Sequence, residues 1–324
     1  VHKAKTSEAD GGREVAVKIL RPGVASRFLR DISDMKYAAR LAERSSQEAQ
    51  RLRLVQVVET LERSVRLEMD LRLEEGGSSE FRDNISADPD FRTPEIDWNR
   101  TGREVLTTEW IDGIPLSNLE ALREAGLDFP KLGANVIQSF LRHAVRDGFF
   151  HADMHQGNLF VDAQGKIVAV DFGIMGRLNL AERRFLAEIL FGFITRDYRR
   201  VAIVHFDAGY VPRTHAVEEF AQAIRAVGEP IHSRTADQIS MARVLTLLFE
   251  ITALFDMSTR TELVLLQKTM VVVEGVARSL DPNLNMWTTA EPVIRAWIED
   301  NLGPSGKMRD AGDAVGAALL ALAR

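Results

Sequence analysis

The chain has 324 residues, with 41 basic and 47 acidic side chains, and therefore a formal net charge of −6. Apolar residues make up 45% of the chain and charged residues 27%, which excludes disorder and fibrous structure. There is no cysteine, which excludes disulfide scaffolds, thiolate zinc sites and thiol nucleophiles. Mild acidity without a basic block argues against nucleic acid as a partner. At about 150 residues per domain, the length predicts two lobes.

The two ends of the chain carry little signal. The sequence begins at Val1 without Met, and no run of about 18 apolar residues is present, so no membrane span is expected. The stretch 311–323 is apolar but short and contains Asp313. It predicts a terminal helix packed on the body; the alternative is the stub of a membrane-associated helix.

The first third of the chain mixes strands and helices. Residues 1–21 predict a β-hairpin around the turn Asp10-Gly-Gly, and apolar spacing predicts helices near 28–42 and 54–69. Gly76-Gly77 is expected to end the second helix. Two strands are expected at 91–98 and 104–111. We therefore place one lobe at residues 1–112 and a mainly helical lobe at 113–324.

An irregular segment at 148–179, between regions of helical pattern, contains the candidate catalytic and metal-binding residues. His151-Ala-Asp153 is followed by Asn158, a short hairpin and then Asp171-Phe-Gly. Carboxylate and amide oxygens at Asp171 and Asn158 suit Mg²⁺, which takes few protein ligands. Asp153 would orient or deprotonate an attacking hydroxyl or water. The order and spacing predict a phosphoryl-transfer site; the alternatives are an Asp-rich turn and a zinc site at His151 and His155.

Lys18 is a further candidate site residue, because it is a charged residue within the apolar strand pattern Val15-Ala-Val-Lys18. A buried lysine must be paired or lose its charge, and in a kinase-type site it contacts the nucleotide phosphates and is held by a helix glutamate. Candidate partners are Glu68, Asp70 and Glu74; a solvated helix face is the alternative reading of these acids.

These residues resemble the UbiB/Aarf/ADCK family of atypical protein-kinase-like proteins, linked to ubiquinone biosynthesis. The matching segments are Glu14-Val-Ala-Val-Lys-Ile-Leu-Arg-Pro-Gly23, Glu68-x-Asp70, Glu109-Trp-Ile-Asp-Gly113, His151-Ala-Asp-Met-His-Gln-Gly-Asn158, Asp171-Phe-Gly-Ile-Met-Gly-Arg177 and Leu266-Gln-Lys-Thr-Met270. The resemblance implies an α+β, two-lobed protein-kinase-like fold. The N-lobe would be small and mixed, a partial sheet plus helices, and the C-lobe large and mainly helical.

The resemblance also implies roles for individual residues. The catalytic residues would be Asp153 and Lys18, and the metal ligands Asn158 and Asp171. Cofactor binding would fall to Lys18, Glu68, Asp70, Glu74, Glu109 and Ile111, with Glu74 as the helix partner of Lys18. The cofactors would be ATP and Mg²⁺. The partners would be nucleotide, a quinone-precursor lipid or membrane surface, and a second copy of the chain.

The expected activity is that of a UbiB-type atypical kinase or ATPase supporting ubiquinone biosynthesis, at the cytoplasmic side of the inner membrane. The alternatives are a catalytically weak scaffold that binds nucleotide or lipid, and a small-molecule phosphotransferase. The family's Lys-x-Gly-Gln helix and Ala-rich nucleotide loop are not in this sequence, nor are its C-terminal membrane helices. We therefore expect either a chain clipped at both ends or a divergent short form, and in both cases weak nucleotide affinity.

Overall fold

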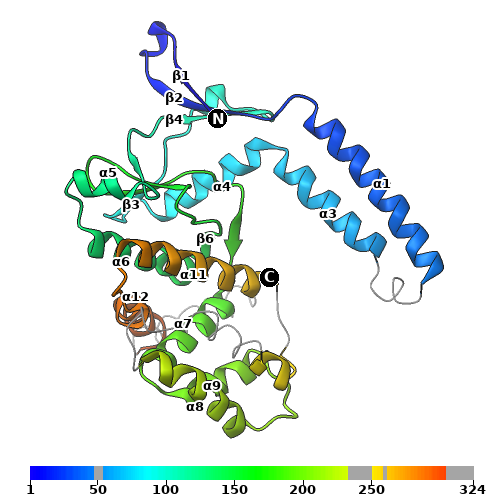
Figure 1. Ribbon diagram of the computed structural model, residues 1–324, viewed down its shortest axis with the longest axis vertical. Coiled ribbons are helices and arrows are strands. Elements are labelled where there is room, and N and C mark those ends of the chain that lie inside the picture. Colours follow the sequence, from blue (N-terminus) through cyan, green and yellow to red (C-terminus); the bar gives the residue numbers. More distant parts are fainter. Residues whose placement is uncertain (47–53, 233–249, 258–260, 304–324) are drawn as a thin grey trace, which may run out of the picture. The chain divides into compact units, whose positions relative to one another are not determined.

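The computed structural model describes residues 1–46, 54–232, 250–257 and 261–303 (Figure 1). The chain divides into two compact units. Unit 1 consists of residues 1–86, 92–113 and 168–173, and unit 2 takes the described residues of 87–91, 114–167 and 174 onward. The predicted terminal helix at 311–323 lies outside the described residues.

Unit 1 contains a three-stranded antiparallel sheet in the order β1-β2-β4, formed by His2–Lys5, Glu14–Ile19 and Val105–Glu109. The predicted hairpin is confirmed: Lys3 pairs with Ala16, and the turn uses Gly11 and Gly12, both at positive φ. Lys18 lies opposite Leu106 in the register of β2 with β4. Val15 and Leu106 are buried, which anchors the central strand.

The helices of unit 1 are α1 (Val24–Ser45), α3 (Leu54–Glu68) and α4 (Leu71–Asn84). Both predicted helices are confirmed, and α1 packs against α3, with Ile32, Ala39 and Val65 buried. An ion pair of 2.6 Å between Lys36 Nζ and Glu62 Oε2 also joins the two helices.

Two sequence predictions for unit 1 were wrong. The second helix was expected to end at Gly76-Gly77, but it ends at Glu68, and α4 then runs through both glycines. Buried packing explains the continuation: Leu71, Glu75, Ser78 and Phe81 form one covered face, which outweighs a cost of about 1 kcal/mol per glycine. The expected strand 91–98 is only β3 (Phe91–Arg92), with Trp98 in a 3₁₀ turn.

The remaining strands are short. A four-stranded sheet has the order β3-β8-β7-β5, in which β8 is Ile167–Ala169, β7 is Leu159–Val161 and β5 is Ile114–Pro115. The predicted β7–β8 hairpin is confirmed, with its turn closed from Gly165 N–H to Asp162 O. β6 (Phe149–His151) pairs antiparallel with β9 (Met175–Arg177).

Helices make up the rest of unit 2. They are α5 (Leu119–Glu124), α6 (Phe129–Leu141), α7 (Leu180–Ile194), α8 (Tyr198–Asp207), α9 (Val217–His232), α11 (Thr261–Leu280) and α12 (Met286–Leu302). α6 packs against α11 and α12, and α7 against α8 and α12. α6 continues as a π-helical turn, η3 (Arg142–Asp147), before β6.

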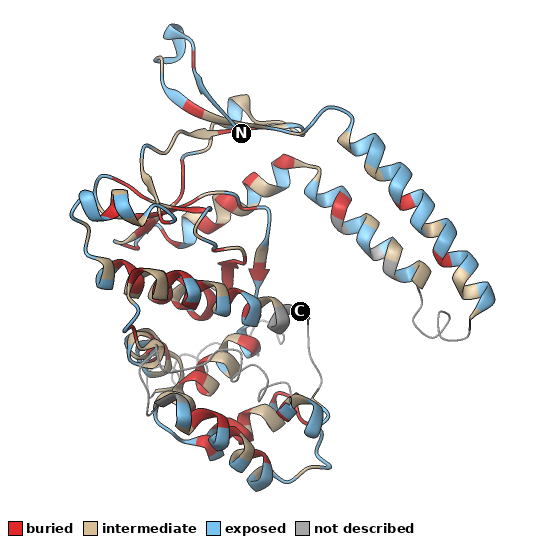
Figure 2. Cartoon of the chain, in the orientation of Figure 1, coloured by how far each residue is buried: buried red, intermediate tan, exposed pale blue. Residues whose placement is uncertain are grey.

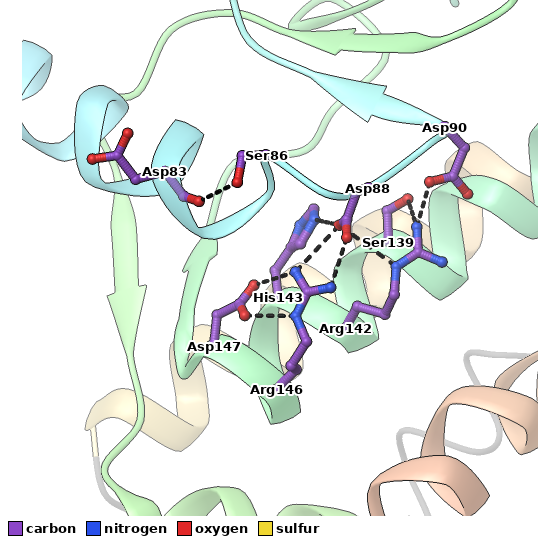
Figure 3. Close-up of polar contacts among 9 residues, drawn as sticks. All are labelled: Asp83, Ser86, Asp88, Asp90, Ser139, Arg142, His143, Arg146 and Asp147. Carbon is purple, nitrogen blue, oxygen red and sulfur yellow. Dashed lines mark hydrogen bonds and ion pairs between the residues drawn. The ribbon is translucent and has the colours of Figure 1, made fainter.

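A buried ionic cluster fixes residues 87–91 to this π-helical turn (Figure 3). Arg146 donates to both carboxylate oxygens of Asp88, at 2.6 and 3.3 Å, and His143 Nε2 lies 3.3 Å from Asp88 Oδ2. Burial disfavours the Asp88 carboxylate, but the hydrogen bonds from His143 and Arg146 outweigh it and hold its pKa well below the usual range. Burial lowers the pKa of His143, so the ring stays neutral.

Asp88→Asn should lower the free energy of unfolding by about 2 kcal/mol at neutral pH, because the buried Asp88 carboxylate loses its ion pair with the partly exposed Arg146. A depressed pKa stabilises the fold above the unfolded-state value and loses this effect as the pH falls. The difference from wild type should therefore shrink in acid. The control is Asp83→Asn at an exposed position nearby, and urea unfolding is the measurement. Equal losses in both variants would contradict the role given to Asp88.

Candidate functional site

Three segments of unit 1 meet at the ammonium of Lys18. Its Nζ donates to Glu74 Oε1 at 2.7 Å and Oε2 at 3.0 Å, and to Asp171 Oδ1 at 3.1 Å. The lysine comes from strand β2, the glutamate from helix α4 and the aspartate from the segment after β8. The structure thus selects Glu74 among the three acidic candidates.

The pKa values of Lys18, Glu74 and Asp171 shift in different directions. Burial opposes the charged form of Lys18, but its contacts with Glu74 and Asp171 outweigh burial and raise its pKa. Burial raises the pKa of Glu74 despite the ammonium, whereas the ammonium outweighs burial at Asp171 and lowers its pKa. One cation therefore balances two carboxylates, and Asp171 is the more strongly ionised of the two.

Asp171 has an unusual backbone. Its φ is +64°, in the left-handed region that few residues other than glycine adopt. Its Oδ1 also lies 3.4 Å from the N–H of Gly173, and the neighbouring Phe172 ring packs on Phe81 of α4 with centroids 5.6 Å apart. Such strain persists only where surrounding contacts over-determine it, and it is concentrated at functional sites.

The catalytic-loop residues lie in unit 2. His151 ends β6 and is fully buried, and its Nδ1 accepts a hydrogen bond of 3.1 Å from Asp153 N–H. Asn158 Nδ2 donates to Asp153 O at 3.1 Å, and this leaves its Oδ1 as the amide atom able to hold a cation. Oxygen donors from Asn158 and Asp171 have the hard character that Mg²⁺ requires, so the residues present fit that ion.

His155 braces the loop rather than forming a zinc site. Its Nδ1 accepts from Gly157 N–H at 3.0 Å, so the proton of the neutral ring sits on Nε2, which lies 3.6 Å from Asp153 Oδ2. A Cβ at Gly157 would approach this ring to 2.9 Å, so a larger residue there would have to displace the His155 side chain. Within the described ranges no group of three or more His, Asp or Glu residues could hold a metal, and the zinc alternative gains no support.

Sequence reasoning gave no role to Thr269, although it noted the segment around it. Thr269 is fully buried on α11, and its hydroxyl lies 3.0 Å from Ala152 O and 2.8 Å from Leu265 O. Ala152 N–H in turn donates to Ile174 O. A helix more than a hundred residues downstream therefore contacts the catalytic loop through the Thr269 hydroxyl. This contact is a reason for the threonine in the Gln-Lys-Thr segment.

Other predicted cofactor residues have partners of their own. Asp70 caps α4 and pairs with Arg72, whose hydrogen bonds lower its pKa to about 2, while exposed Glu68 ends α3. In the described chain neither acid forms an ion pair with Lys18. Glu109 ends β4 and accepts from Arg92, and half-buried Ile111 follows that strand. Their contact with a cofactor stays a prediction.

A second buried carboxyl lies beside Glu74. Glu75 is 1% exposed, and its Oε2 has no hydrogen-bond partner among the described residues. Burial, reinforced by the charge of Glu74, raises its pKa to about 7. No sequence signal marked Glu75, because adjacent helical residues point in different directions and burial is a tertiary property.

Comparisons with known proteins place the chain in a family. Residues 1–205 match the ABC1 atypical kinase-like domain, and residues 224–285 match the UbiB helical domain. The chain belongs to the UbiB family of ABC1 atypical kinase-like proteins. The resemblance inferred from the motifs is thus confirmed, as is the kinase-like α+β fold.

Two curated relatives show how far the similarity extends. The chain is 41% identical over 302 residues to "Probable protein kinase UbiB" of Marinobacter nauticus, covering 92% of this UbiB-family chain and 55% of the relative. It is 40% identical over 314 residues to the protein of that name from Pseudomonas aeruginosa PAO1, covering 96% and 58%. The chain thus spans little more than half the length of these relatives.

A solved structure has the same fold. Rv3197 of Mycobacterium tuberculosis, solved in complex with erythromycin, aligns with a TM-score of 0.68 at 23% identity, over 91% of this chain and 74% of that one. Among the described residues, no helix combines the length and apolar character needed to cross a bilayer.

Lys18→Met should destabilise the protein by about 1–3 kcal/mol at neutral pH, because two carboxylates lose their shared cation; partial exposure of the ammonium keeps the loss moderate. Adding Glu74→Gln should recover part of that loss. A double-mutant cycle by urea unfolding measures the coupling. Strict additivity of the two substitutions would refute the pairing.

Glu75→Gln should raise the free energy of unfolding at pH 8 by about 1–3 kcal/mol. The raised pKa means that ionisation of Glu75 costs the folded state stability as the pH rises through about 7. The gain should fade as the pH falls towards and below the ordinary value of 4.5, since the carboxyl becomes protonated in both states there. Exposed Glu104→Gln is the control, and a pH-independent difference would contradict the assignment.

Proposed function

We propose that this protein is a Mg²⁺- and ATP-dependent ATPase or phosphotransferase that supports ubiquinone biosynthesis. The observation that carries the proposal is the Lys18 ammonium held by Glu74 and Asp171, since kinase-type sites use such a lysine, held by a helix glutamate, at the nucleotide phosphates. The ubiquinone link rests on the relatives, which carry the name UbiB.

Each side chain has a proposed task in that reaction. Lys18 binds phosphate oxygens, and Glu74 keeps its ammonium in place and charged. Asp171 and Asn158 hold Mg²⁺, which supplies neutralisation of the phosphate charge when bound. Asp153 accepts a proton from the attacking hydroxyl or water at a carboxylate oxygen, and His155 fixes the loop on which it lies.

The proposal also covers where the protein acts and what it binds. We expect the chain to act at the cytoplasmic face of the inner membrane, close to a quinone-precursor lipid. Nucleotide is the expected small-molecule partner, and a second copy of the chain a further one.

Phosphate release from Mg-ATP tests the proposal. Asp171→Asn and Lys18→Ala should abolish turnover, and Asp153→Asn should reduce the rate by about 10²–10⁴ if Asp153 is a general base. Exposed Glu104→Gln should leave the rate unchanged. Turnover that persists in all three site variants would reject the assignment.

Two alternatives give different results with the same protein. A pseudokinase scaffold would show a thermal shift with Mg-ATP but no released phosphate. A small-molecule phosphotransferase would release little free phosphate and would instead label an added hydroxyl acceptor. The same thermal-shift titration can compare substitutions at the other predicted cofactor residues, Asp70, Glu68, Glu109 and Ile111. Only a substitution at a residue that contacts the cofactor should weaken binding.

A further inference from the structure

The two carboxylate oxygens of Asp153 have different surroundings. Oδ2 lies 3.5 Å from the side-chain amide nitrogen of Asn158 and 3.6 Å from Nε2 of His155. Among the described residues, none makes a hydrogen bond or ion pair with Oδ1. The Asp153 side chain is 33% exposed, so an incoming hydroxyl or water can meet Oδ1 without displacing an N–H donor.

The ring of His155 is held so that Nε2 faces this carboxylate. Its Nδ1 accepts the Gly157 N–H at 3.0 Å, which leaves the proton of the neutral ring on Nε2. The backbone of the same residue is fixed as well, because His155 O accepts the Asn158 N–H at 2.9 Å. An N–H group therefore points from a fixed ring towards Oδ2 of Asp153.

The neighbouring histidine of the loop, His151, has only part of this arrangement. Each of the two histidines accepts, at Nδ1, the backbone N–H of the residue two positions later. His151 is fully buried at the end of β6, a strand that is buried along its whole length (Figure 2). The side chain of His155 is instead 51% exposed beside the catalytic carboxylate. Bracing the backbone is stronger where water is excluded, so the exposed ring edge of His155 suits a task at Asp153 instead.

We propose that His155 is a positioning residue for the catalytic base: its Nε2–H binds Oδ2 of Asp153 and thereby presents Oδ1 to the phosphoryl acceptor. The assignment rests on the proposed function and adds the atom that takes the proton. That proton moves from the hydroxyl or water oxygen to Oδ1, and His155 keeps its own proton throughout. The 3.6 Å separation is long for a hydrogen bond, but catalytic contacts are often long without substrate and tighten when it binds.

The orientation of this carboxylate affects the rate because a general base needs its accepting oxygen within hydrogen-bond reach of the acceptor. The terminal torsion of an aspartate side chain is broad and roughly two-fold. Donors from His155 and Asn158 on the same oxygen restrict that rotation to one arrangement. A misplacement of about 1 Å can slow a reaction about 10²-fold. Loss of the His155 donor should therefore slow the chemical step and leave nucleotide binding intact.

Two amide substitutions separate positioning from bracing. In His155→Gln the amide nitrogen can take the place of Nε2 and donate to Asp153. In His155→Asn the amide oxygen can replace Nδ1 as acceptor for the Gly157 N–H, but the shorter side chain leaves no donor at the place of Nε2. For phosphate release from Mg-ATP, kcat should stay within about threefold of wild type in His155→Gln and fall at least about tenfold in His155→Asn. KM for ATP should be unchanged in both variants.

A matched control removes a similar contact outside the site. His215 Nε2 lies 3.2 Å from Asp256 Oδ2, and His215→Asn makes the same substitution there. It should leave kcat unchanged. Thermal unfolding checks that each variant is folded.

The imidazole nitrogens give a readout that needs no turnover. Long-range proton–nitrogen correlation spectra of the nucleotide-free chain should show His155 as the Nε2–H tautomer, with its signals identified by their loss in His155→Gln. Asp153→Asn should shift the Nε2 signal of His155. It should not move the signals of His205, whose Nδ1 lies 2.8 Å from Val201 O on α8.

Each further outcome has one interpretation. If His155 only braces the loop, the order reverses and His155→Asn is the milder variant. A higher KM for ATP in both variants would assign the ring to the nucleotide phosphates instead. An Nδ1–H tautomer, or an Nε2 signal that Asp153→Asn leaves in place, would overturn the contact itself. Absence of wild-type turnover together with the expected Nε2 shift would reject the proposed reaction and still support the orientation of Asp153 by His155.

Discussion

The candidate site depends on one ammonium group shared between two carboxylates. Lys18 joins strand β2, helix α4 and the segment that begins at Asp171, three pieces of chain far apart in sequence. Its pKa is raised because the two acids together outweigh the cost of burial. This single cation therefore joins the three segments of unit 1 locally, and it is the positive charge on which the proposed function depends.

Several features around Lys18 lower the stability of the fold. Glu74 and Glu75 are adjacent buried carboxyls, and Asp171 has a left-handed backbone. Each feature costs folding free energy, and the structure retains them because neighbouring contacts over-determine the conformation. The Phe81–Phe172 contact is one such support, since it fixes the segment of Asp171 to α4 independently of charge.

The catalytic loop is supported in a different way, by hydrogen bonds that neighbouring segments make to its backbone. His151 receives the Asp153 N–H, Thr269 donates towards Ala152, and β6 pairs with β9. Gly176 is required there, because a Cβ would come within 2.2 Å of the Phe150 ring. Supports of this kind fix the backbone of Asp153 while its carboxylate stays partly exposed.

The sequence by itself determined the family, the hairpin strands around Lys18 and the loop from His151 to Asn158, because these depend on local spacing and turn chemistry. It also narrowed the partner of Lys18 to three acids. The family resemblance favoured Glu74, and the tertiary structure confirmed that Glu74 pairs. That Asp70 caps a helix instead was decided only by the tertiary structure, since two acids near one helix terminus look alike in sequence. Packing likewise carried α4 through Gly76-Gly77, buried Glu75 and brought Thr269 to Ala152. Burial and long-range contacts of this kind arise only when distant segments meet, and no local pattern encodes them.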